Sequence, residues 1–184
     1  MKSLLIAVAL SATLFITAQS KDVYIEVTFN SGIFKGTHKF TPEKGNYMSQ
    51  VNIKFFEGES NLNASKLVAE NGLQIHYISR TFLGEATKGN HKTKTSTTGC
   101  GSLNFIDLKG TKSYNRADGV FKNCENVDIQ SVTDWKKGTV KRRRIVQGSF
   151  TDTIEFGFTM DDGTKKTETV EVSIKFIANE SRMD

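Results

Sequence analysis

Alternation of apolar and polar residues limits the fold of this chain more than any other feature of its sequence. Residues 154–160 place Ile, Phe, Phe and Met at every second position, and residues 170–176 repeat the pattern with Val, Val, Ile and Phe. A repeat of two residues is that of a β-strand with one buried face. Asp161-Asp162-Gly163, between the two segments, is typical of a tight turn. The pattern therefore predicts a long antiparallel hairpin in the last third of the chain.

Shorter segments of the same kind occur along the rest of the chain, separated by turn residues. We expect strands at 23–29, 33–40, 51–55, 73–82, 103–108, 127–132 and 140–150. Thirteen phenylalanines and a single proline agree with a strand-rich composition. Because no segment resembles a crossover helix, the sheet should be antiparallel. We predict an all-β fold, a single antiparallel β-sandwich, with a closed β-barrel as the alternative that satisfies the same pattern.

One segment departs from this alternation and predicts a short helix. Asn61 is a suitable N-cap, residues 62–70 could form the helix, and Asn71-Gly72 provides a C-terminal stop. The segment has fewer than about three turns, so its stability would depend on packing rather than on helix propensity.

The N-terminal residues have the three regions of a secretory signal peptide. Lys2 supplies a positive charge, residues 4–16 form a mostly apolar run, and small residues suitable for cleavage lie within 17–20. The apolar run is shorter than the roughly 20 residues of a membrane span. It is also interrupted by Ser11 and Thr13. The segment therefore predicts export and not a membrane anchor.

Removal of this segment defines the mature protein. We predict that residues 1–20 are a cleaved signal peptide, with cleavage after Ala18 or after Ser20. Residues 21–184 would then form a single β-rich domain with a polar C-terminal tail at 178–184. The mature protein would be soluble, in the periplasm or outside the cell.

Cys100 and Cys124 are the only cysteines of the chain. In an exported protein, such a pair without other metal-ligating residues nearby predicts one disulfide bond. Closing a loop of about 25 residues would stabilise the fold by about 3 kcal/mol. The alternative is a nucleophilic Cys100, but a reactive thiol needs a nearby cation and an orienting histidine. The sequence supplies no such arrangement.

A long polar segment precedes the first cysteine. Between Gly84 and Gly101 the composition changes, and residues 87–98 contain no large apolar side chain. A long surface loop of this kind is either functional or loosely ordered. We expect Cys100 to hold its far end in place.

The strongest charge feature is a basic segment with six cations in nine positions, namely Lys136, Lys137, Lys141, Arg142, Arg143 and Arg144. The formal net charge is +5, so the chain would carry −1 without these six (5 − 6). In a strand, Lys141 and Arg143 would point to one side and Arg142 and Arg144 to the other, so neither side could be dry.

Two interpretations of the basic segment are open. It could be an edge strand or projecting hairpin whose charges prevent sheet-to-sheet association. It could instead bind an acidic surface, such as an anionic glycan or a lipid head group. Nucleic acid is a weaker candidate because no neighbouring exposed aromatic residue is available to stack on bases, and because the chain is expected to be exported.

The sequence contains no pattern that identifies a catalytic site, a metal site or a cofactor. His38, His76 and His91 are far apart and lack the spacings typical of metal ligands. We therefore expect a non-catalytic binding or surface-associated module whose long loop and basic segment contact an anionic partner. Two alternatives are a barrel-type carrier of a small apolar ligand, with phenylalanines lining its cavity, and a hydrolase with a site dispersed over several strands.

Overall fold

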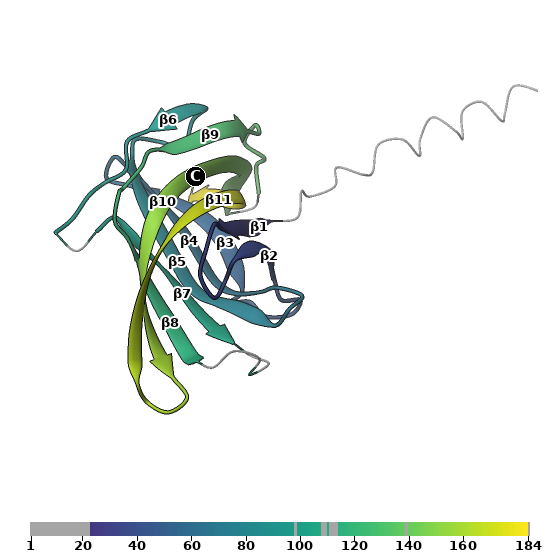
Figure 1. Cartoon of the computed structure of the whole chain (residues 1–184). Coiled ribbons are helices and arrows are strands. Elements are labelled where there is room, and N and C mark those ends of the chain that lie inside the picture. The colour runs from purple at the N-terminus through teal and green to yellow at the C-terminus, as the bar shows by residue number, and fades with distance from the viewer. Residues whose placement is uncertain (1–22, 98, 108–109, 111–113, 139, 184) are drawn as a thin grey trace, which may run out of the picture.

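The computed structural model describes residues 23–97, 99–107, 110, 114–138 and 140–183, and these residues form eleven β-strands and no helix (Figure 1). The strands are β1 (Tyr24–Phe29), β2 (Gly36–Pro42), β3 (Gln50–Phe56), β4 (Glu59–Val68), β5 (Leu73–Leu83), β6 (Gly89–His91), β7 (Gly101–Asp107), β8 (Tyr114–Phe121), β9 (Val127–Val132), β10 (Lys141–Met160) and β11 (Lys165–Met183). The prediction of an all-β fold is confirmed. The predicted signal peptide, residues 1–20, lies outside the described residues.

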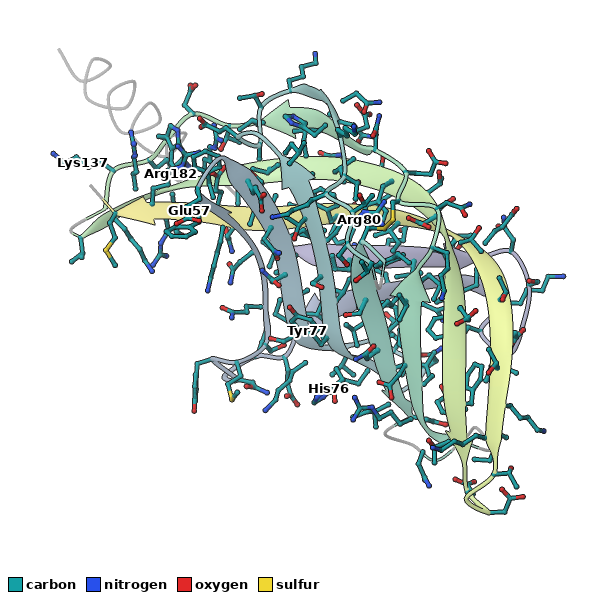
Figure 2. The ribbon with its side chains drawn as sticks, turned by 90° about the vertical axis from the view of Figure 1, so that its left-hand side faces the viewer. Glu57, His76, Tyr77, Arg80, Lys137 and Arg182 are labelled. Atoms are coloured by element: carbon teal, nitrogen blue, oxygen red, sulfur yellow. A yellow bond between two sulfur atoms is a disulfide. The ribbon has the colours of Figure 1, made fainter. Side chains whose placement is uncertain are left out.

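The predicted C-terminal hairpin is the longest element of the fold. β10 and β11 pair antiparallel from Lys141 opposite Met183 to Thr159 opposite Lys165. Seen from the side, the two strands run almost the full length of the molecule (Figure 2). The turn between them forms as the sequence predicts, and the Gly163 amide donates to the Met160 carbonyl at 2.9 Å. This hairpin places the basic segment at one end of the molecule and the Asp-Asp-Gly turn at the other.

All strands belong to one mixed sheet, in the order β2-β1-β11-β3-β4-β5-β7-β8-β10-β9-β6, with further pairings of β2 with β4 and of β10 with β11. The expectation of a purely antiparallel sheet is wrong at one place. β11 pairs with β3 in parallel, through Asn179 opposite Asn52 and Glu180 opposite Ile53. β11 pairs with β1 along Val172–Ile177 and extends beyond it, so its last residues reach β3. Strand alternation specifies neither the partner nor its direction.

The predicted short helix is wrong, because residues 59–68 form β4. This strand pairs with β3 on one side and β5 on the other, which satisfies backbone groups that a short isolated helix would have to pair within itself. Lys66 has a φ of 51°, and the alternation of buried residues shifts there, from Leu62 and Ala64 to Leu67. This shift hid the strand pattern. The predicted helix stop is a turn, in which the Gly72 amide donates to the Ala69 carbonyl at 3.0 Å.

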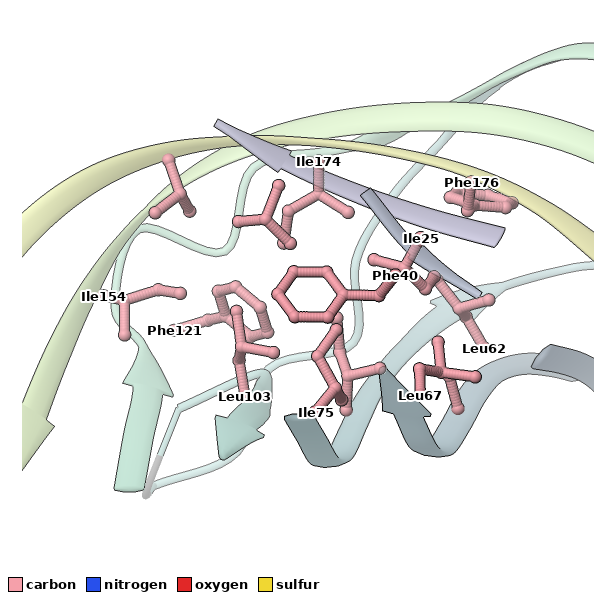
Figure 3. Close-up of a cluster of buried hydrophobic side chains, with 14 of the residues drawn as sticks. Ile25, Phe40, Leu62, Leu67, Ile75, Leu103, Phe121, Ile154, Ile174 and Phe176 are labelled. Atoms are coloured by element: carbon pink, nitrogen blue, oxygen red, sulfur yellow. The ribbon is translucent and has the colours of Figure 1, made fainter. Parts of the chain in front are cut away.

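Side chains from opposite parts of the sheet meet in one apolar core, as in a sandwich (Figure 3). Ile25 of β1 and Ile174 and Phe176 of β11 lie on one side, facing Leu62 of β4 and Ile75 of β5. All five side chains have a relative exposure of 0%. Removing apolar surface of this extent from water is the main driving force for such a fold.

Several phenylalanines of the core contact one another. The ring of Phe34 lies 4.9 Å from that of Phe105, 5.2 Å from that of Phe29 and 5.4 Å from that of Phe156, measured between ring centres. Tilted aromatic pairs at these distances attract each other beyond the effect of burial alone. The many phenylalanines of the sequence therefore pack the space between the two sides of the sheet.

The residues predicted as a polar C-terminal tail continue β11 as far as Met183. Within this part of the strand, Ala178 and Glu180 are fully buried. A buried carboxylate needs a cation or hydrogen-bond donors around it, and the partners of Glu180 lead directly to the basic segment.

Candidate anion-binding site

The basic segment is a hairpin at one end of the molecule. Lys141, Arg142, Arg143 and Arg144 begin β10, whereas Lys136 and Lys137 precede it. Lys136 and Arg143 exchange two backbone hydrogen bonds, of 2.7 and 2.9 Å. Figure 2 shows Lys137 and Arg182 at the end of the molecule where β11 finishes.

The segment has two faces, as strand geometry requires, and the pairing with β11 determines what each face meets. Lys141 lies opposite Met183, and Arg143 lies opposite Ser181. Lys141 and Arg143 line a surface groove, described below. Arg144 lies opposite Glu180 and points to the interior, with a relative exposure of 8%.

Arg144, which the sequence grouped with the binding residues, is already bound within the protein. Its Nε donates to Glu180 Oε2 at 2.7 Å, and its Nη2 donates to Glu85 Oε1 and to the Ala86 carbonyl, both at 3.1 Å. Hydrogen bonds between a guanidinium and carboxylates are among the strongest in proteins. Arg144 therefore holds the hairpin to the body of the protein and is not available to an external anion.

A second arginine, Arg182 of β11, completes this internal network. Its Nη2 lies 2.7 Å from Glu85 Oε1 and 2.9 Å from Glu180 Oε1. Its guanidinium also lies over the ring of Phe55, at 4.7 Å. Two carboxylates are thus shared between two arginines, and the pairing fixes the end of β11 against both β10 and the segment that carries Glu85.

Trp135 lies at the centre of the arginines, and sequence reasoning missed it. The guanidinium of Arg144 lies 4.4 Å from the ring, and those of Arg142 and Arg182 each lie 5.0 Å from it. Tryptophan has the most favourable ring for such cation–π contacts. The sequence-based expectation concerned exposed aromatic residues that could stack on bases; Trp135 is half-buried and already contacts three of the protein's own arginines.

The groove lies between β3 on one side and the first residues of β10 and the last residues of β11 on the other. The parallel pairing of β3 with β11 covers only two residue pairs, Asn52–Asn179 and Ile53–Glu180. Beyond it, Phe56 and Met183 border the groove without further pairing of the two strands. Its volume is about 710 Å³, and it is lined by Gln50, Asn52, Ile53, Lys54, Phe55, Phe56, Lys141, Arg143, Asn179, Ser181, Arg182 and Met183.

The groove is strongly basic. Four of its lining residues are Lys or Arg and none is Asp or Glu, and of these four Arg182 is paired with Glu85 and Glu180. Within the described part of the chain, Lys54, Lys141 and Arg143 form no ion pair with an acidic side chain. Glu57 follows Phe56 in the turn to β4 and is not one of the lining residues. Cations gathered in a concave surface without counter-charges attract anions.

The predicted long loop is ordered over much of its length. It contributes Glu85 and Ala86 to the network around Arg144. It also contains β6, which pairs with β9. Farther along, the buried Thr93 hydroxyl donates to the Glu125 carbonyl at 2.6 Å. The loop therefore holds Arg144 through Glu85 and Ala86, and its contact with a partner stays a prediction.

The predicted disulfide between Cys100 and Cys124 is present, with the two Cα atoms 5.5 Å apart. Arg80 lies beside it in the interior (Figure 2). The Arg80 Nη1 donates to Cys100 Sγ at 3.0 Å and to Asp152 Oδ2 at 2.7 Å, and its Nη2 donates to the Glu125 carbonyl.

Arg80 and Asp152 form a fully buried ion pair. The exposure of both side chains is 0%. Burial lowers the pKa of Arg80, while the hydrogen bond to Asp152 acts in the opposite direction. The other carboxylate oxygen of Asp152 accepts the amides of Asn123, at 2.8 Å, and Thr153, at 2.7 Å. Arg80 Nε has no hydrogen-bond partner, but both side chains are shielded from water, so this cluster connects parts of the core.

The histidines do not converge on this site. His38 Nε2 lies 2.7 Å from the Phe34 carbonyl, and His91 Nε2 lies 2.7 Å from the Thr87 carbonyl. His76 is exposed on β5. In the residues that the structure describes, no group of three or more His, Cys, Asp or Glu side chains could hold a metal ion.

The described residues include no helix that is long and apolar enough to cross a membrane. Comparison with known proteins yields no match to the chain among family models, curated proteins or solved structures.

Proposed function

We propose that the protein is an exported, non-catalytic binding module whose groove takes an anionic partner. One observation carries the proposal: Lys54, Lys141 and Arg143 line one groove, and no acidic side chain of the described residues neutralises them. These cations come from strands far apart in the sequence, β3 and β10. The fold therefore places several positive charges close together, where they repel one another. A bound anion would reduce this repulsion.

Protection of a sheet edge explains the basic segment less well. Charged residues on an edge strand discourage pairing with other chains. However, β10 pairs with β8, β9 and β11, and the sheet order ends in β2 and β6. Arg143 itself has its backbone paired with Lys136 on one side and Ser181 on the other. The charges thus lie on a strand that needs no such protection.

The described geometry favours a binding module over a carrier of apolar ligands. The phenylalanines that suggested a cavity contact one another, as the 4.9 Å separation of the Phe34 and Phe105 rings illustrates. The disulfide agrees with an oxidising compartment outside the cytosol, which is part of the proposal.

Salt-dependent retention on a heparin column tests the proposed function. We expect the Lys54→Gln/Lys141→Gln/Arg143→Gln variant to elute at a markedly lower salt concentration than the unmodified protein, because three contacts with the polyanion are lost. The matched control is Lys35→Gln/Lys165→Gln/Lys166→Gln, which removes the same charge from exposed positions outside the groove. Equal elution of the two variants would mean that only net charge matters and would overturn the proposal.

A further inference from the structure

Three strongly exposed apolar side chains lie at the end of the molecule that carries the basic groove. The relative exposure is 73% for Phe56, 72% for Val140 and 84% for Met183. Phe56 and Met183 line the groove itself. Val140 directly precedes Lys141, whose backbone lies opposite Met183 and whose carbonyl accepts the Gly138 amide at 3.1 Å. The three side chains therefore share the end of the molecule that carries the cations.

A single exposed apolar side chain needs no explanation, but this combination does. A soluble polyanion would contact the cations and leave the apolar side chains in water. At the surface of an anionic bilayer both features are used. Lys and Arg attract the lipid phosphates, while apolar side chains enter the boundary between head groups and acyl chains.

We propose that the anionic partner is the surface of a lipid bilayer. Lys54, Lys141 and Arg143 contact lipid phosphates, and Phe56 and Met183 insert beside them, together with Val140 at the tip of the hairpin. The inference rests on the proposed function, since it assigns a partner to the same groove. It adds that the apolar rim contributes to binding, which no water-soluble polyanion requires.

The arrangement of the internal network suits this role. Arg144, Arg182, Glu85 and Glu180 hold the ends of β10 and β11 together. The backbone that carries the exposed side chains beside them is therefore held in place before binding. Binding then loses little conformational entropy of the backbone.

Co-sedimentation with vesicles tests the inference. The protein is mixed with vesicles of phosphatidylcholine alone and of phosphatidylcholine containing phosphatidylglycerol. We expect partition onto the anionic vesicles only. The Phe56→Ser/Val140→Ser/Met183→Ser variant should lower the partition coefficient about tenfold, because apolar burial is lost. Its elution from heparin should not change. Loss of each groove cation should lower the partition coefficient about fivefold.

Tyr47→Ser is the matched control for loss of an exposed aromatic side chain. Tyr47 is 90% exposed and precedes β3, whereas Phe56 ends that strand. The control should partition like the unmodified protein. Circular dichroism should show that all variants retain the strand signal, since the substituted side chains are exposed.

Two results would contradict the inference and leave the proposed function intact. One is unchanged vesicle partition of the apolar variant, and the other is heparin retention without any binding to anionic vesicles. Equal binding to neutral vesicles would also overturn it, because the cations would then have no role. If the groove-cation variant and its charge-matched control instead elute alike from heparin, the proposed function itself fails.

Discussion

The protein contains two arginine networks that differ in how completely they are enclosed. In the core, Arg80 meets Asp152, the Cys100 sulfur and the Glu125 carbonyl, and its guanidinium lies 4.7 Å from the Phe150 ring. At the end of the β10–β11 hairpin, Arg144 and Arg182 share two carboxylates. The side chains of the core ion pair are wholly buried, and Arg80 Nε is left without a hydrogen-bond partner, whereas the hairpin network borders a groove with additional cations that form no ion pair.

This difference separates structural from binding residues within one short stretch of sequence. A buried charge must have a partner, because the free energy needed to remove an unpaired charge from water is large compared with the net stability of a fold. Arg144 obeys this rule as Arg80 does. Lys141 and Arg143 remain in water, so they can stay unpaired until a ligand arrives. Burial, more than residue type, thus determines which arginines of the basic segment have a structural role.

The largest effect should come from breaking the core network. Arg80→Met leaves Asp152 buried without its cation, and we expect the free energy of unfolding to fall by about 3–5 kcal/mol. Urea unfolding followed by circular dichroism measures the loss. Heparin retention of the folded fraction should not change, since Arg80 does not reach the groove.

A double variant distinguishes the lost partner from lost packing. In Arg80→Met/Asp152→Asn neither position carries a charge, and the side-chain amide oxygen can still accept the amides of Asn123 and Thr153, so much of the stability should return. If the double variant is as unstable as Arg80→Met alone, the unpaired charge of Asp152 is not the cause of the lost stability. The core network would then not depend on charge pairing.

Within the basic segment, Arg144 and Lys141 should behave differently although they are three positions apart. Arg144→Gln removes hydrogen bonds to Glu180 and Glu85, and we expect a loss of about 1–3 kcal/mol in the free energy of unfolding. Lys141→Gln changes an exposed side chain and should alter stability by less than about 0.5 kcal/mol. It should instead lower the salt concentration needed for elution from heparin.

Chemical unfolding and heparin elution of both variants provide the measurement. The assignment of roles would be wrong if Lys141→Gln destabilised the protein as much as Arg144→Gln. It would also be wrong if Arg144→Gln reduced retention more than Lys141→Gln did in the folded state.

Much of this architecture could be predicted from the sequence because its cause is local. The alternation in residues 154–160 and 170–176 predicted the hairpin, and the two cysteines predicted the bridge that is present. β4 was missed because the shift at Lys66 interrupts the alternation. The parallel contact of β11 with β3 joins segments far apart in the chain, and no local pattern reports such a pairing.

The role of Arg144 could have been found by extending the alternation. The buried positions of β10 are the even-numbered ones from 146 to 158, and Arg144 continues that series. Likewise, Glu180 continues the series of buried residues Val170 to Ala178 in β11. An arginine and a glutamate at inward positions of two paired strands predict a buried ion pair. Lys54, by contrast, joins the groove only through the long-range pairing of β3.

The smallest expected effect concerns Trp135, whose ring contacts both the exposed Arg142 and the buried Arg144. Trp135→Phe keeps an aromatic ring but weakens the cation–π contacts of Arg142, Arg144 and Arg182, so the free energy of unfolding should fall by about 0.5–1 kcal/mol. Trp135→Leu removes the ring altogether and should cost more than Trp135→Phe. Because Trp135 is the only tryptophan, unfolding of both variants is followed by circular dichroism. Equal stability of the Phe and Leu variants would show that the ring acts through packing alone, and Arg144 would then depend on Glu85 and Glu180 as completely as Arg80 depends on Asp152.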